Sequence, residues 1–141
     1  MSQENLDLIL RAVASANAGD VDAAVDLYHP DAELRDLQHP PDTPEVLRGR
    51  DAIVAALRRW LEVLDDWTIE LHEYVDAHPW VVGEVTWHAT GKGSNTPIDW
   101  RVAEAYEVKD GKITRVLAGF PDIATALKAV GLEDRPPTPG R

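Results

Sequence analysis

The sequence predicts an α+β fold in which N-terminal helices pack on one face of a curved antiparallel sheet. Apolar residues recur at helical spacing through much of the first 64 residues, whereas alternating strand patterns fill residues 67–120. Consecutive long strands joined by short turns favour an antiparallel meander, because parallel strands need a crossover connection between them. The same pattern excludes a doubly wound parallel sheet.

Three helices are predicted before the long strands, over residues 3–18, 20–28 and 50–64. Gly19 is a natural left-handed stop for the first helix, and Asp20 is a favoured N-cap for the second. Pro30 closes the second helix, since the residue before a proline avoids the helical conformation. A short strand over 32–37 and a loop with three prolines over 38–45 separate the second helix from the third.

Four strands are predicted to follow, over residues 67–75, 80–90, 97–108 and 112–120. Asp110-Gly111, immediately before the last of them, is a specific hairpin signal. A final short helix is predicted over 123–130, with Asp122 favoured as its N-cap and Gly131 as its stop. The proline-rich tail over 133–141 is expected to be disordered, so residues 1–132 form the single predicted domain.

Composition excludes several classes of function. The 141 residues carry a net charge of −11 and the pI is about 4.7, so no basic surface is available for nucleic-acid phosphates or anionic membranes. The absence of cysteine excludes disulfides, thiolate catalysis and cysteine-ligated metals. No apolar run reaches membrane-span length and the N-terminus does not resemble a signal peptide, so we expect a cytoplasmic protein that does not bind membranes.

One carboxylate interrupts an otherwise apolar strand face. In the strand predicted over 97–108, the core face carries Ile98, Trp100, Val102, Glu104, Tyr106 and Val108. An ionised carboxylate in apolar surroundings must be paired, solvated or protonated. A cavity lined by this strand would account for Glu104, which makes it the best functional candidate in the chain. The alternatives are pairing with Arg35, Arg101 or a backbone amide, and a strand twist that exposes the side chain.

Four short segments carry a family likeness. They are Asn17-Ala18-Gly19-Asp20, Asp26-Leu27-Tyr28-His29-Pro30-Asp31-Ala32, Gly49-Arg50-Asp51-Ala52-Ile53 and Asp110-Gly111-Lys112-Ile113. They resemble the nuclear-transport-factor-2-like superfamily, which includes SnoaL-like polyketide cyclases and ketosteroid isomerase. The resemblance covers residues 6–123 and implies a cone-shaped fold around a deep apolar pocket, with dimerisation through the outer sheet face. Its motifs are specific for the fold and weak for the reaction.

The comparison with ketosteroid isomerase assigns roles to two carboxylates. Asp36 occupies the place of the isomerase's general base, a few residues after Asp31-Ala32, and Glu104 matches its protonated oxyanion-hole acid. The isomerase's oxyanion tyrosine aligns with Ala12, so that hydroxyl is missing and steroid isomerase activity itself is not expected. Tyr106, two residues beyond Glu104 on the same face, is the predicted replacement donor. Spacing alone favours the alternative that Asp36 is a solvated aspartate at a strand end beside the proline-rich loop, and the resemblance is what makes it a catalytic candidate.

The candidate substrate-binding residues are mostly aromatic or aliphatic. They are Trp60, Trp87, Trp100, Val102, Val116, Phe120 and His39. An aromatic wall suits a planar ligand, although core packing explains the same pattern. Among the five histidines only His39 is placed to reach a pocket mouth, and no pair has metal-ligand spacing, so neither a metal nor another cofactor is expected.

The sequence therefore favours a cofactor-independent enzyme of the isomerase, cyclase or dehydratase type. Its pocket carboxylates would act on a mostly apolar carbonyl or phenolic molecule. One alternative is a non-catalytic dimeric module that binds a hydrophobic ligand. A second is an epoxide-type hydrolase, in which Arg101 would join Asp99 or Asp36 around a water. We expect a homodimer, formed through the outer face that carries Thr86, His88, Asp99, Arg101, Ala103 and Ala105.

Overall fold

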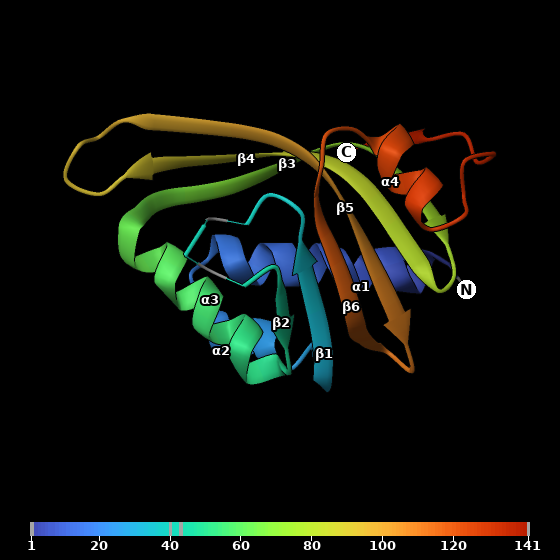
Figure 1. Ribbon diagram of the computed structural model, residues 1–141, viewed down its shortest axis with the longest axis horizontal. Coiled ribbons are helices and arrows are strands. Elements are labelled where there is room, and N and C mark those ends of the chain that lie inside the picture. Colours follow the sequence, from blue (N-terminus) through green and yellow to red (C-terminus); the bar gives the residue numbers. More distant parts are fainter. Residues whose placement is uncertain (1, 40, 43, 141) are drawn as a thin grey trace.

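The computed structural model describes residues 2–39, 41–42 and 44–140 and confirms the α+β prediction (Figure 1). Its helices are α1 (Ser2–Asn17), α2 (Val21–Val25), α3 (Arg50–Val63) and α4 (Ile123–Ala129). Its strands are β1 (Tyr28–Asp36), β2 (Val46–Arg48), β3 (Leu64–Ala77), β4 (Trp80–Gly91), β5 (Pro97–Lys109), β6 (Lys112–Phe120) and β7 (Thr138–Pro139).

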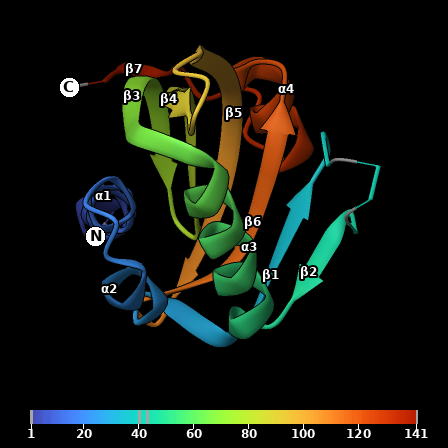
Figure 2. The same ribbon diagram turned by 90° about the vertical axis from the view of Figure 1, so that its left-hand side faces the viewer.

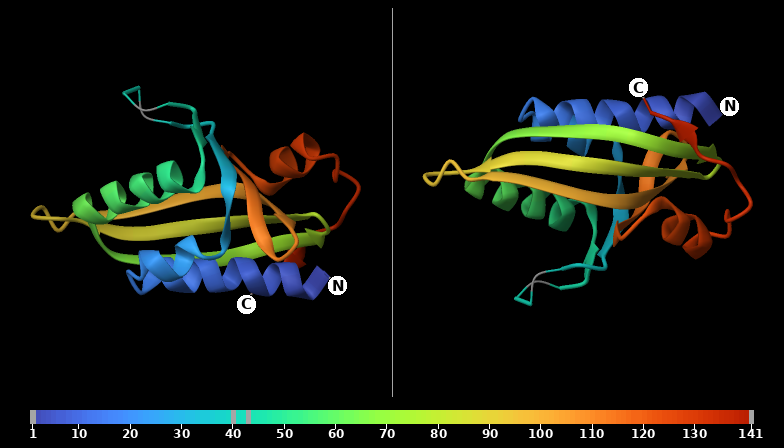
Figure 3. Two further views of the ribbon diagram at one scale, coloured as in Figure 1. Left: turned by 90° about the horizontal axis from the view of Figure 1, so that it is seen from below. Right: turned by 90° about the horizontal axis from the view of Figure 1, so that it is seen from above.

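All described strands belong to one sheet with the order β2-β1-β6-β5-β4-β3-β7. The pairing of β1 with β6 is parallel, and the other neighbouring pairs are antiparallel. Figure 2 shows the sheet curving around α1 and α3, with α4 on its opposite face. In Figure 3, α1 runs along the long strands β3 to β5. The curvature gives the sheet a concave face, which α1 and α3 cover, and a convex face, part of which α4 covers.

Each face of the sheet has its own hydrophobic core. The concave core joins α1 to the sheet and includes Leu6, Ile9, Ile53, Val81 and Ile113. The convex core lies under α4 and includes Val82, Ala105, Phe120, Ile123 and Leu127. Because successive strand residues point to opposite faces, β4 and β5 contribute alternate residues to the two cores.

The structure corrects the predicted boundary between α2 and β1. Tyr28 was predicted to end the second helix, but it is the first residue of β1. Pro30 explains the difference, because it favours an extended conformation at His29 and so lets the strand begin early. The short strand β2, which pairs with β1, was not predicted because it contains only three residues.

A bulge in β3 changes which face its later side chains occupy. Leu71 pairs with Val85, but the next pair is Glu73 with Glu84, so His72 is the extra residue. Uninterrupted alternation along this strand would place Tyr74 on the outer face with His72. The bulge instead turns Tyr74 towards the concave core, where it packs.

The tail after α4 is ordered at Thr138–Pro139, contrary to the expectation of disorder. These residues form β7 and pair with Glu73 and Tyr74 at the edge of β3. The backbone N–H of Gly140 then donates to the carbonyl of His72 at 2.7 Å. An edge strand offers unpaired backbone groups, and this pairing satisfies some of them.

Candidate functional site

A cavity of about 380 Å³ lies between α3 and the concave face of the sheet. This volume falls within the range typical of small-molecule sites, about 300–1,000 Å³. The candidate residues that line it are Asp36, His39, Trp60, Trp87, Trp100, Val102, Glu104, Tyr106 and Val116. Nine of the ten candidates thus lie on one cavity.

Phe120 is the candidate that lies elsewhere. It is 5% exposed and packs in the convex core with Ile123 and Leu127. The alternation of β6 predicted an inner position, but the chain twists at Gly119, whose φ is +89°. Phe120 therefore supports α4 and does not contact the cavity.

Four tryptophans form one wall of the cavity. The ring centroids of Trp67 and Trp87 are 5.2 Å apart in an edge-to-face arrangement. Trp60 lies 6.4 Å from both Trp67 and Trp100 and is 37% exposed at the mouth. Trp67 was predicted only as a strand residue, and the sequence did not place it in this wall. The arrangement offers flat apolar surfaces to a planar ligand.

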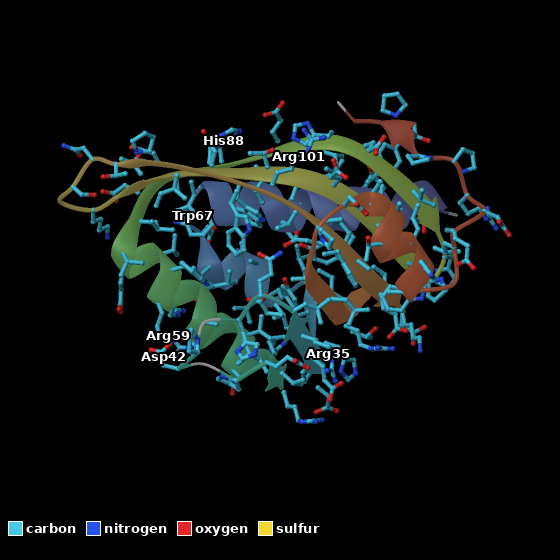
Figure 4. All side chains as sticks on the ribbon, turned by 45° about the horizontal axis from the view of Figure 1, so that its top comes forward. Arg35, Asp42, Arg59, Trp67, His88 and Arg101 are labelled. Carbon is cyan, nitrogen blue, oxygen red and sulfur yellow. The ribbon has the colours of Figure 1, made fainter. Side chains whose placement is uncertain are left out.

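Glu104 projects from β5 into the cavity opposite Gly83 of β4. The Tyr106 hydroxyl donates to Glu104 Oε1 at 3.0 Å, and the Trp87 indole also hydrogen-bonds to the carboxyl group. The predicted alternative of an arginine partner is wrong for Arg101. That guanidinium binds Glu84 Oε2 at 2.6 and 2.9 Å, and Figure 4 shows it on the convex face with His88.

Burial raises the pKa of Glu104 above its ordinary value, and the charge of Asp36 raises it further. The hydrogen bonds from Tyr106 and Trp87 oppose that rise. Desolvation dominates because a carboxylate loses water here without gaining a cation. A neutral carboxyl can donate a hydrogen bond, so Glu104 is equipped to act as a donor towards an oxygen in the cavity.

Asp36 reaches the cavity from the end of β1. Its Oδ1 accepts the backbone N–H of Gln38 at 2.9 Å. Gly119 permits this placement, since a Cβ there would stand 3.0 Å from Asp36 Oδ1. Asp36 and Glu104 thus enter one cavity from different strands, β1 and β5.

Tyr28 is a cavity residue that the sequence analysis missed. It lines the cavity, as does Ala12, the position that lacks the isomerase's tyrosine. Burial and the charge of Glu104 raise the pKa of Tyr28, so its hydroxyl stays protonated. Pro30 favours an extended chain before it, which would have placed Tyr28 in the strand. Alternation could not have fixed the face of its side chain, because the register of β1 shifts between Tyr28 and Glu33.

Several other predictions concern residues outside the cavity. Asp122 caps α4 as expected, with Oδ1 accepting Thr125 N–H at 2.8 Å, and these hydrogen bonds lower its pKa. The Asp-Arg-Asp cluster of an epoxide-type hydrolase is not formed, because Arg101 binds Glu84 and Asp99 binds His88 at 2.6 Å. Both pairs lie on the convex face.

Within residues 2–39, 41–42 and 44–140, no group of three or more histidine, aspartate or glutamate side chains is arranged to hold a metal ion. No helix in the same part of the chain is both long and apolar enough to cross a membrane.

Comparison with known proteins agrees with this architecture. Among the solved structures that share the fold is a protein from Catenulispora acidiphila DSM 44928 with a ketosteroid isomerase-like fold, in complex with trimethylamine; its sequence identity is 18%, the match covers 92% of this chain and 97% of that chain, and the TM-score is 0.70. TerC, co-crystallised with polyporic acid, has 20% identity, coverage of 94% of this chain and 99% of that chain, and a TM-score of 0.70. A Xanthomonas campestris pv. campestris protein provisionally assigned as a polyketide cyclase has 21% identity, coverage of 91% of this chain and 97% of that chain, and a TM-score of 0.67. No curated protein is significantly similar in sequence. The SnoaL-like domain model matches residues 9–116, and the chain therefore belongs to the SnoaL-like family.

Proposed function

We propose that this protein is a cofactor-independent enzyme that moves a proton on a mostly apolar carbonyl or phenolic molecule. The observation that carries the proposal is the Glu104–Tyr106 pair in an apolar cavity that also receives Asp36. Burial favours the neutral form of Glu104 and leaves it able to donate. Two carboxyl groups in unlike environments are the parts that acid/base catalysis needs.

In the proposed reaction Asp36 removes a proton from the carbon next to the substrate carbonyl. The C–H electron pair moves into the new C=C bond, and negative charge develops on the carbonyl oxygen. Glu104 donates a hydrogen bond to that oxygen, and the Tyr106 hydroxyl turns from Glu104 Oε1 to donate a second one, so that both stabilise the charge. Protonated Asp36 returns the proton to another carbon in an isomerisation. In a cyclisation, the enolate carbon attacks a second carbonyl of the substrate, and protonated Asp36 gives its proton to the new alkoxide. In a dehydration, the enolate expels a β-hydroxyl group, which takes the proton from Asp36 and leaves as water.

The cavity wall supports an aromatic or polycyclic substrate. Trp67 and Trp87 present ring faces and edges within the cavity, and Trp60 and Trp100 extend this surface to the mouth. The fold neighbours accord with this class, since one was crystallised with polyporic acid and another is provisionally assigned as a polyketide cyclase.

Proton exchange tests the proposal without the natural substrate. Aryl ketones that stabilise the protein in a thermal-shift screen are incubated in ²H₂O, and loss of the α-proton is followed by NMR. The wild type should accelerate the exchange, and Asp36→Asn and Glu104→Gln should each slow it by about 100-fold or more. Asp99→Asn, on the convex face of the strand that carries Glu104, is the matched control and should exchange at the wild-type rate.

Exchange of the α-proton at the wild-type rate in both Asp36→Asn and Glu104→Gln would refute the proposed roles of Asp36 as base and Glu104 as donor. Tight binding of ketones without any exchange would instead favour the non-catalytic ligand-binding module, because the apolar cavity serves a carrier equally well.

We also propose a homodimer, now with a smaller interface than the sequence suggested. Ala103 and Ala105 are fully buried under α4 and cannot contact a partner. His88, Asp99 and Arg101 remain accessible on the convex face, whereas Thr86 is only 9% exposed and pairs with His72. Sedimentation velocity at micromolar concentration should show a dimer, and Arg101→Glu should weaken it; a wild-type monomer would refute the interface.

A further inference from the structure

A second cavity, the inner chamber, lies between α1 and the strands β3 and β4. Its volume is about 150 Å³. Ile9 and Leu10 of α1 and Ile69 and Leu71 of β3 form much of its wall. Its lining is predominantly apolar, so it favours an apolar occupant over water, which needs two to four polar partners.

The inner chamber and the main cavity share the Glu104–Tyr106 pair as a common wall. Both residues line both cavities, and they are the only described residues with this property in the two linings. A group bound by this pair therefore lies next to a cavity on each side of the pair. One side is the tryptophan wall of the main cavity, and the other is the aliphatic wall of the inner chamber.

Gly83 keeps the inner chamber open beside this pair. It lies directly opposite Glu104 in the register of β4 and β5, and it lines the chamber. A Cβ at this position would stand 3.2 Å from Leu71 Cδ1. Glycine inside a strand reduces stability and often marks a place where another group approaches closely. Here the missing side chain leaves room within the chamber.

We propose that the inner chamber is a second subsite, which takes a short alkyl arm of the substrate whose carbonyl binds Glu104 and Tyr106. This inference rests on the proposed function for the position of the carbonyl. An apolar protein cavity of about 150 Å³ binds benzene or xenon, so the chamber accommodates a propyl or butyl group but not a fused ring system. The substrate class is then a ketone with a large planar arm on one side and a small aliphatic arm on the other.

A homologous series of alkyl 2-naphthyl ketones tests the subsite by isothermal titration calorimetry. The naphthyl group is too large for the inner chamber, so it must occupy the main cavity. Affinity for the wild type should rise about fourfold for each methylene added from the methyl to the propyl ketone, because each buried methylene contributes a fixed transfer free energy.

Two variants fill the inner chamber, and one fills the main cavity. Gly83→Ala and Leu10→Phe should remove most of the gain with alkyl length while leaving the methyl ketone's affinity within about threefold of wild type. Ala56→Leu narrows the main cavity from α3 and is the matched control. It should weaken all the ketones similarly and preserve the gain per methylene.

If the wild type binds all the ketones but its affinity does not rise with each added methylene, the subsite is overturned and the proposed carbonyl site stays intact. The same gain in the wild type and in both chamber-filling variants would also overturn it. Failure of every ketone to bind the wild type would overturn the subsite together with the carbonyl site on which it rests.

Discussion

Replacing Glu104 by glutamine is expected to stabilise the protein increasingly as the pH rises above 4.5. The substitution preserves the size of the side chain and keeps an oxygen that can accept from Tyr106. It removes the ionisation that burial and Asp36 oppose. The variant therefore separates the cost of a buried charge from the packing of the side chain.

The magnitude follows from the raised pKa of Glu104. Below its ordinary value of 4.5, both the folded and the unfolded chain hold the proton, so the two proteins differ by a constant free energy. Between 4.5 and the raised folded pKa, the unfolded chain releases the proton first. The wild type then loses about 1.4 kcal/mol of stability relative to the variant for each pH unit. Above the folded pKa the difference is constant again.

Urea unfolding followed by tryptophan fluorescence, from pH 4 to pH 9, measures this difference. In an Asp36→Asn background, the difference in unfolding free energy should stop growing at a lower pH, because the charge of Asp36 contributes to the raised pKa of Glu104. Parallel stability curves for the wild type and Glu104→Gln would show that the folded protein does not favour the protonated acid. The proposed donor role would then be wrong.

Glu107→Gln is the matched control, since Glu107 lies on the same strand and is 8% exposed. Its carboxylate accepts from Thr114 Oγ1 at 2.8 Å and lies 3.9 Å from Arg115. Neutralising this partnered group should reduce stability at pH 7 by about 1 kcal/mol. At pH 7, Glu104→Gln should therefore raise the free energy of unfolding and Glu107→Gln should lower it.

Two further predictions concern the convex face. Phe120→Ala should lower the free energy of unfolding by about 3–5 kcal/mol, because it leaves a void under α4. The variant should keep the wild-type affinity for naphthyl ketones. Loss of ketone binding by a folded variant would show that Phe120 belongs to the site. Hydrogen bonds to Asp99 and Glu70 raise the pKa of His88 above 6.5. The free energy of unfolding of the wild type should exceed that of His88→Gln most below pH 6.5, and this difference should decline as the pH rises through the folded pKa of His88. A difference that grows from pH 6 to pH 9 would contradict the pairing of His88 with Asp99 and Glu70.

The candidate site was predicted where local alternation holds without interruption. The β5 strand is regular from Ile98 to Glu104, so reading every second residue placed Trp100, Val102 and Glu104 on one face, and the structure agrees. The same method failed at Tyr74 and Phe120. A bulge precedes the first and a positive-φ glycine precedes the second, and each turns the following side chain to the other face.

The sequence by itself determined the fold class, the long elements and the presence of a carboxyl group on an apolar face. These properties depend on short-range periodicity, which 3.6-residue and two-residue repeats encode directly. Tertiary structure alone decided what surrounds that carboxyl group. Glu104 meets Tyr106 within its own strand, but Asp36, Trp87 and the inner chamber reach it from β1, β4 and α1. A pKa depends on the dielectric and charges within a few ångströms, and the curved sheet brings those groups together from segments far apart in the chain.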